Sequence, residues 1–146
     1  MIVIGIGNAI HTYAGVQLRL ACARLMARQG TAEPPGQAKL TWAYNLPCRY
    51  VLHTVGPVVW GEVTPTHRAQ LAGCYRACLD LAAAHGLGSV AFCCISTGEF
   101  HFPNQLAAEI AVETVAAWQR QHPNQVEVIF NVFQDRDKAI YQRLLG

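Results

Sequence analysis

Charged residues are scarce in this 146-residue sequence, at 14%, against about 25% in an average globular domain. Lysine and arginine number 11 and aspartate and glutamate nine, a balance that excludes a protein holding nucleic acid mainly through its phosphates. Long apolar runs are lacking too, because Val90–Ile95 is only about a third of the roughly 20 residues that span a bilayer. No basic leader with a cleavage site is present. We therefore expect a soluble, cytoplasmic protein that contacts neither nucleic acid nor a membrane.

Disulfide and zinc-finger spacings are also missing, although the chain has six cysteines. It contains no C-x-x-C motif, and no Cys and His set has zinc-finger spacing. Cys93 and Cys94 are adjacent and would point to opposite faces of a strand, whereas Cys74 and Cys78 would share one face of a helix. All six cysteines are expected to be reduced and mostly buried.

Hydrophobic residues make up 52% of the sequence, which predicts a folded chain with a single core. Apolar periodicity alternates between helical and extended, the pattern of a three-layer α/β architecture. The double proline within Gly30–Gln37 marks a loop. The expected elements are a helix ending at Gly30, strands at Lys39–Thr41 and Tyr50–Val55, a helix from Pro65 to Gly86, a buried strand at Ser89–Ile95, a helix at Asn104–Gln121, a strand at Val126–Phe133 and a helix at Asp135–Leu145.

Ligands of open α/β sheets bind beyond the carboxyl ends of the strands. This rule selects three loops, Thr54–Pro57, Ser96–Pro103 and Phe133–Asp137. In the middle loop, Ser96, Thr97 and Gly98 place two hydroxyls and an unhindered backbone before a helix, which suits a diphosphate. Phe100, Phe102 and Phe133 add aromatic surface. The alternative is that the Ser-Thr-Gly segment is a plain turn and the phenylalanines belong to the core.

Two other sites are disfavoured by the sequence. Gly5 and Gly7 follow an apolar strand, as in a dinucleotide-binding unit, but the third glycine position holds Ile10 and no acidic strand end follows. The six histidines are scattered, so the sequence pairs none of them with a cysteine.

Six segments, in matching order and spacing, resemble macrodomains. Within that superfamily, the segment CCISTGEFHFP is similar to the zinc-dependent bacterial macrodomains found alongside sirtuin-type ADP-ribosyltransferases, which remove ADP-ribose from modified proteins. The segments are NAIHTYAGVQLR at Asn8–Arg19, YNLPCRYVLHTVGP at Tyr44–Pro57, CYRACLDLA at Cys74–Ala82, VAFCCISTGEFHFP at Val90–Pro103, AAEIAVETVAAW at Ala107–Trp118 and VIFNVFQDRDKAIY at Val128–Tyr141.

The resemblance implies an α/β/α fold with a mixed central sheet and with ADP-ribose across the carboxyl edge of its strands. The loop at Ser96–Phe100 would line the diphosphate and the distal ribose, Asn8 and Ile6 would flank that ribose, and Phe133 and Asp135 would lie toward the adenosine. The implied substrate-binding residues are Ile6, Asn8, Ser96, Thr97, Gly98, Glu99, Phe100, Phe133 and Asp135.

The sequence also departs from this family. Macrodomains normally open with two strands, an acidic residue that reads the adenine and an Asn-rich strand end, and these do not precede Met1. Residues 1–146 are therefore expected to be one N-terminally incomplete macrodomain. The zinc-type members carry a cysteine and an aspartate where this sequence has Gly5 and Gly7, and glycine has no side chain to bind zinc. We expect no metal or other cofactor.

The favoured interpretation is a hydrolase that releases mono-ADP-ribose from modified proteins by cleaving a glycosidic or ester bond. Glu99 is the candidate general base, being the one carboxylate near the loop. The expected binding partner of the protein is then ADP-ribose or a mono-ADP-ribosylated protein. One alternative is a non-catalytic module that binds ADP-ribose or a related nucleotide, which Gly5 and Gly7 favour. The other is a folded remnant that binds nothing.

Overall fold

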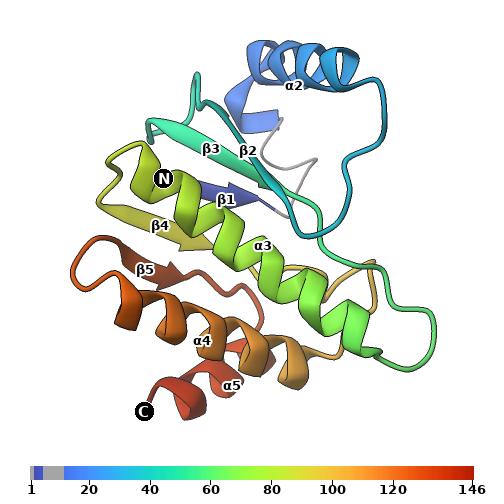
Figure 1. Cartoon of the computed structure of the whole chain (residues 1–146), viewed down its shortest axis with the longest axis vertical. Helices are drawn as coiled ribbons and strands as arrows, with labels where there is room; N and C mark the ends of the chain where they lie inside the picture. Colours follow the sequence, from blue (N-terminus) through green and yellow to red (C-terminus); the bar gives the residue numbers. More distant parts are fainter. Residues whose placement is uncertain (1, 5–11) are drawn as a thin grey trace.

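A mixed five-stranded sheet organises the part of the chain that this computed structural model describes, residues 2–4 and 12–146 (Figure 1). The strand order is β2-β3-β1-β4-β5, and only the β2–β3 pair is antiparallel. The carboxyl ends of the four parallel strands consequently meet at one edge. The strands are β1 (Ile2–Ile4), β2 (Ala38–Trp42), β3 (Tyr50–Thr54), β4 (Ser89–Phe92) and β5 (Glu127–Phe130).

Helices cover both faces of this sheet, as the three-layer prediction requires. Figure 1 shows α3 and α4 side by side across one face, where Leu52 and Phe92 belong to the same buried core as these helices and α5. Alternation along β3 turns His53 to the opposite face, where Cys22 of α2 lies 3.9 Å from its ring nitrogens. The helices are α2 (Val16–Gln29), α3 (Pro65–Ala84), α4 (Asn104–Gln121) and α5 (Asp135–Leu145).

A chain of aromatic rings runs through the core and ends at its side, where Phe130 is only partly buried. The ring centroids of Tyr75 and Phe92 lie 4.8 Å apart, those of Phe92 and Phe130 6.4 Å, and those of Phe130 and Tyr141 4.9 Å. These contacts join α3, β4, β5 and α5 and add the interaction energy of aromatic pairs to the burial of apolar area.

Local signals fix the helix ends that the sequence predicts. Gly30 ends α2 in the left-handed conformation, with φ of 74°, and its N–H donates to the carbonyl of Met26. Thr64 begins α3 with a capping box in which its hydroxyl accepts the His67 N–H and the His67 side chain accepts the Thr64 N–H. A threonine cap followed by proline is a strong helix start. The predicted bounds of α4 and α5 match the structure as well.

Three strands are shorter than the sequence patterns predict, β3 only by its last residue, Val55. The run Ser89–Ile95 leaves the sheet after Phe92, and Val126–Phe133 contributes only Glu127–Phe130. Ile95 is nevertheless 2% exposed, because it packs in the loop that follows. The apolar pattern in the sequence therefore continues beyond the last hydrogen bonds of β4, because Ile95 is still buried.

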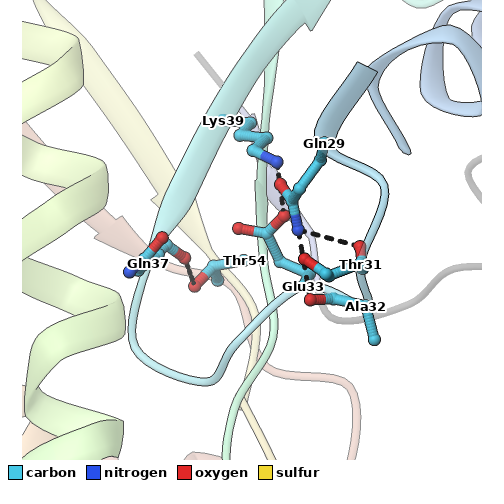
Figure 2. Close-up of polar contacts among 7 residues, drawn as sticks. All are labelled: Gln29, Thr31, Ala32, Glu33, Gln37, Lys39 and Thr54. Atoms are coloured by element: carbon cyan, nitrogen blue, oxygen red, sulfur yellow. Dashed lines mark hydrogen bonds and ion pairs between the residues drawn. The ribbon is translucent and has the colours of Figure 1, made fainter. Parts of the chain in front are cut away.

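The connection from Gly30 to Gln37 is fastened to the segment that follows β3. Figure 2 shows Lys39 paired with Glu33, at 2.6 Å, and the Thr54 hydroxyl donating to the Gln37 carbonyl, at 2.5 Å. The Val55 carbonyl accepts the Gly36 N–H at 3.1 Å and the Cys74 thiol at 3.3 Å. The backbone is thus held in place at the start of the first predicted site loop, Thr54–Pro57.

All six cysteines lie within the described residues, and none forms a disulfide. Cys74 and Cys78 are buried, whereas the other four are only partly buried, less than the sequence suggested. Burial raises the pKa of the Cys94 thiol to about 12, helped by the nearby Asp137 and Cys93. A thiol with this pKa is protonated near neutral pH and is a poor nucleophile.

No helix among the described residues is both long and apolar enough to cross a bilayer. A hollow of about 680 Å³ lies between β5, α4 and α5, lined by side chains that include Val112, Phe130 and Tyr141. The residues that line it include none of those predicted for the site.

Candidate functional site

The three predicted loops follow β3, β4 and β5 at the carboxyl edge of the sheet. The strand order puts the segment after β4 between the segments after β3 and β5. The predicted residues Ile6 and Asn8, together with Gly5 and Gly7, lie outside the described residues. The site is therefore built here from residues 54–64, 93–103 and 131–137.

Ser96 is the most constrained residue of the middle loop. Its φ is 65°, in the left-handed region that a side chain disfavours. Its Oγ is buried and has no hydrogen-bond partner among the described residues. The loop closes on it through a hydrogen bond from the Phe102 N–H to the Ser96 carbonyl at 2.9 Å. Backbone strain and an unsatisfied buried hydroxyl at one residue are typical of functional sites.

Gly56 supports Ser96 from the neighbouring segment, and sequence reasoning missed it. A Cβ at Gly56 would lie 1.9 Å from Ser96 Oγ and 2.8 Å from Ile95 Cγ2. Both distances are far below van der Waals contact, so only glycine allows the loop to sit this close to the β3 segment. The sequence shows a Gly-Pro pair after the strand, which indicates a turn. It does not show that this glycine contacts Ser96.

The outer part of the loop is open to solvent. Gly98 and Glu99 are exposed, and a Cβ at Gly98 would meet no atom within 4 Å. Thr97 is half-buried and donates its hydroxyl to the Cys94 carbonyl at 3.1 Å. The loop then leads into α4, whose first residues lack a side-chain cap. Exposed backbone N–H groups before a helix N-terminus can bind an anion.

The phenylalanines divide between site and core. Phe102 is 1% exposed and belongs to the core, as the alternative interpretation held. Phe100 is half-buried, and its carbonyl accepts the Val59 N–H at 2.8 Å. Phe133 is fully exposed, and Asp135 is exposed in the first turn of α5. Phe133 thus offers a complete ring face to a ligand on the β5 flank.

A buried polar link connects the two helices that follow these loops. Asn104, the first residue of α4, donates its amide to Asp137 at 2.7 Å, and Asp137 is 7% exposed. A buried hydrogen bond to a carboxylate is strong and directional. This pair fixes the start of α4 against α5. No feature of the local sequence predicts the hydrogen bond.

The zinc-ligand position that the resemblance places at Gly5 lies outside the described residues. No group of three His, Cys, Asp or Glu side chains within residues 2–4 and 12–146 could hold a metal ion. Cys22 lies 3.9 Å from His53 Nε2, which also lies 2.8 Å from the Thr41 hydroxyl. Two ligands fall short of the three protein ligands that a catalytic zinc needs.

Comparison with known proteins agrees with this geometry. The model of the Macro domain family matches residues 3–111. Two proteins named protein-ADP-ribose hydrolase are similar: that of Treponema medium is 54% identical over 97% of this chain and 54% of its own length. That of Staphylococcus aureus is 50% identical over 97% of this chain and 53% of its own length. The chain thus spans about half the length of these relatives.

A solved structure has the same fold. The Oceanobacillus iheyensis macrodomain with ADP superposes with a TM-score of 0.92 at 33% identity, covering 99% of this chain and 81% of that one. The family match includes all of β2, β3 and β4, β1 from its second residue, and the whole middle loop. By sequence and by fold, this chain belongs to the Macro domain family.

Proposed function

We propose that this protein binds ADP-ribose at the carboxyl edge of its sheet and hydrolyses its bond to a modified protein. The observation that carries the proposal is Ser96, a strained residue with a buried, unsatisfied hydroxyl, held at this edge by Gly56. Two relatives at 50% identity or more are named protein-ADP-ribose hydrolases, and a macrodomain of the same fold was solved with ADP.

The diphosphate is proposed to lie along Ser96–Phe100. Backbone N–H groups of this exposed loop and the amino end of α4 supply the positive potential that an anion needs. The adenosine then extends over Phe133 and Asp135 on the β5 flank. Ile6 and Asn8 complete the distal-ribose end in the same proposal.

The proposed reaction is attack of water on the anomeric carbon of the distal ribose. The bond from that carbon to the protein side chain breaks, and the released side chain takes up a proton. Glu99 is exposed on the loop, and its carboxylate could accept the proton of the attacking water. A bound diphosphate would contribute mainly by fixing the orientation of the ribose.

The Cys93–Pro103 segment supports assignment to the sirtuin-associated branch of the family. We propose that this chain acts without the zinc of that branch, since Gly5 and Gly7 offer no ligands. A non-catalytic ADP-ribose module is the second candidate, because the same glycines remove an acidic group. The weak net charge of +2 favours this nucleotide and its protein carriers over nucleic acid or membranes as partners, and six reduced cysteines suit the cytoplasm.

Binding is tested by Gly98→Glu. The new side chain meets open space, so the fold should persist while its charge and bulk repel a diphosphate. Gly88→Glu is the matched control, since Gly88 is exposed and equally unhindered but lies at the amino end of β4. Calorimetric titration with ADP-ribose should show a loss for Gly98→Glu only. No binding by the parent chain, or equal affinities for all three proteins, would reject the site.

Catalysis is tested separately with Glu99→Gln. General base catalysis is worth about 10²–10⁴-fold, so release of ADP-ribose from a modified acceptor should fall by such a factor. The affinity for ADP-ribose should change little, because the amide keeps the shape of the carboxylate. Equal turnover by parent and variant removes Glu99 from the mechanism. Binding without turnover by the parent identifies the non-catalytic module.

A further inference from the structure

An exposed pair of rings lies beside the proposed diphosphate segment, Ser96–Phe100. Trp60 is 80% exposed, and its ring centroid lies 5.2 Å from that of His101, with 48° between the ring planes. The two residues come from the segments after β3 and after β4. They are thus adjacent to the proposed site but are not among the residues assigned to ADP-ribose.

This pair is held in place by its backbone. Val59 is 2% exposed, and its N–H donates to the Phe100 carbonyl at 2.8 Å, which ties the two segments together one residue before each ring. The His101 N–H donates to the Gly98 carbonyl at 3.1 Å, and His101 has a φ of 60°. The rings are therefore fixed at their base while their faces meet solvent. An ordered aromatic surface loses little conformational freedom on binding, which favours affinity.

The strand order decides which end of ADP-ribose would face these rings. The segments that carry Trp60 and Phe133 lie on opposite flanks of the loop after β4, because β3 and β5 lie on opposite sides of β4. With the adenosine over Phe133 and the diphosphate on the loop, the distal ribose points toward the β3 flank. The atom attached to the anomeric carbon belongs to the modified protein, so that protein must leave the site toward Trp60.

We propose that Trp60 and His101 form the contact surface for the polypeptide that carries the ADP-ribose, a step that rests on the proposed function. Tryptophan is enriched among residues that dominate protein interfaces. Glu62 and Glu99, each two residues from a ring, are both exposed and add negative charge. A lysine or arginine beside the modified residue can then stack on Trp60 through a cation–π contact and meet a carboxylate. The surface is accordingly expected to prefer basic acceptor sequences.

The test compares two ligands on three proteins. The ligands are free ADP-ribose and a mono-ADP-ribosylated peptide with flanking lysines, and the proteins are the parent, Trp60→Ala and Trp42→Ala. Trp42 is a matched control, 61% exposed, with its ring centroid 4.8 Å from that of Tyr50, at the opposite edge of the sheet. Both substitutions remove exposed rings, so the fold should tolerate them.

Trp60→Ala should bind free ADP-ribose as the parent does and bind the modified peptide at least about fivefold more weakly. Trp42→Ala should change neither affinity. An equal loss for both ligands would show that Trp60 contacts the nucleotide, and an unchanged peptide affinity would show that it contacts nothing; both results overturn the proposal. A parent that binds no free ADP-ribose refutes the proposed function itself, and the assignment of Trp60 with it.

Discussion

Replacing Ser96 with alanine should make the protein more stable and its ligand binding weaker. The substitution removes one atom, an Oγ that is buried and has no hydrogen-bond partner among the described residues. It keeps the Cβ and therefore the backbone conformation at φ 65°. The variant thus tests the effect of the hydroxyl while the backbone strain at this residue stays the same.

The magnitude follows from the cost of a buried, unsatisfied polar group. Such a group destabilises a folded protein by about 1–3 kcal/mol, so Ser96→Ala should gain up to that amount. For a domain of this length, each kcal/mol shifts Tm by about 2–6 °C. Thr97→Ala gives the opposite expectation, because its hydroxyl makes a hydrogen bond to the Cys94 carbonyl at 3.1 Å. Losing that bond should cost about 0.5–1.5 kcal/mol.

Thermal and urea unfolding of the parent, Ser96→Ala and Thr97→Ala measure these changes, and calorimetry with ADP-ribose measures affinity. If the Ser96 hydroxyl serves the ligand, Ser96→Ala should lose about three- to tenfold in affinity, corresponding to one hydrogen bond of about 1 kcal/mol. A Ser96→Ala variant that is less stable than the parent by 1 kcal/mol or more, with unchanged affinity, would refute the reasoning. It would mean that Ser96 is a structural residue with a partner in the folded protein.

Two further substitutions test the packing and the electrostatics. Gly56→Ala should cost about 1–3 kcal/mol as overpacking, because its Cβ would lie 1.9 Å from Ser96 Oγ and 2.8 Å from Ile95 Cγ2. In urea unfolding, the double variant with Ser96→Ala should be more stable than the sum of the two single effects predicts, and additive effects would disprove the contact. The raised pKa of Cys94, about 12 against an ordinary 9.0, means that the unfolded chain releases this proton first, so the unfolding free energy should fall as pH rises from about 9 toward 12. Unfolding at pH 7.5 and 10.5 under reducing conditions should show a shallower decline for Cys94→Ala than for the parent, and equal declines would contradict the assignment.

Local chemistry made much of this fold predictable. Thr64 before proline, Gly30 after an amphipathic run and the β-branched segment at Tyr50–Val55 each fix an element through contacts a few residues apart. The strand ends were less accurate, because apolar character follows burial and not hydrogen bonding. Ile95 reads as strand but is buried within a loop.

The contacts within the site could not be predicted, because they join residues that are far apart in the sequence. Gly56 and Ser96 are separated by a helix and a strand, and their approach depends on how β3, β1 and β4 are ordered. The Asn104–Asp137 hydrogen bond likewise joins residues far apart in the sequence. A single sequence shows that a glycine or an asparagine is present, but the partner is decided by tertiary packing.

The structure separates the site into a fixed base and an open rim, and the two should respond differently to substitution. At the base, Gly56 and Ser96 are closely packed, so substitutions there should alter stability and ligand binding together. At the rim, Gly98 and Trp60 project into solvent, so their substitution should alter binding and leave stability within about 0.5 kcal/mol. A loop that is already held in a strained conformation without ligand loses less conformational entropy when the ligand binds. Affinity lost at the rim should therefore reflect lost or repelled contacts alone, whereas affinity lost on substitution of Gly56 should include the cost of restoring the loop.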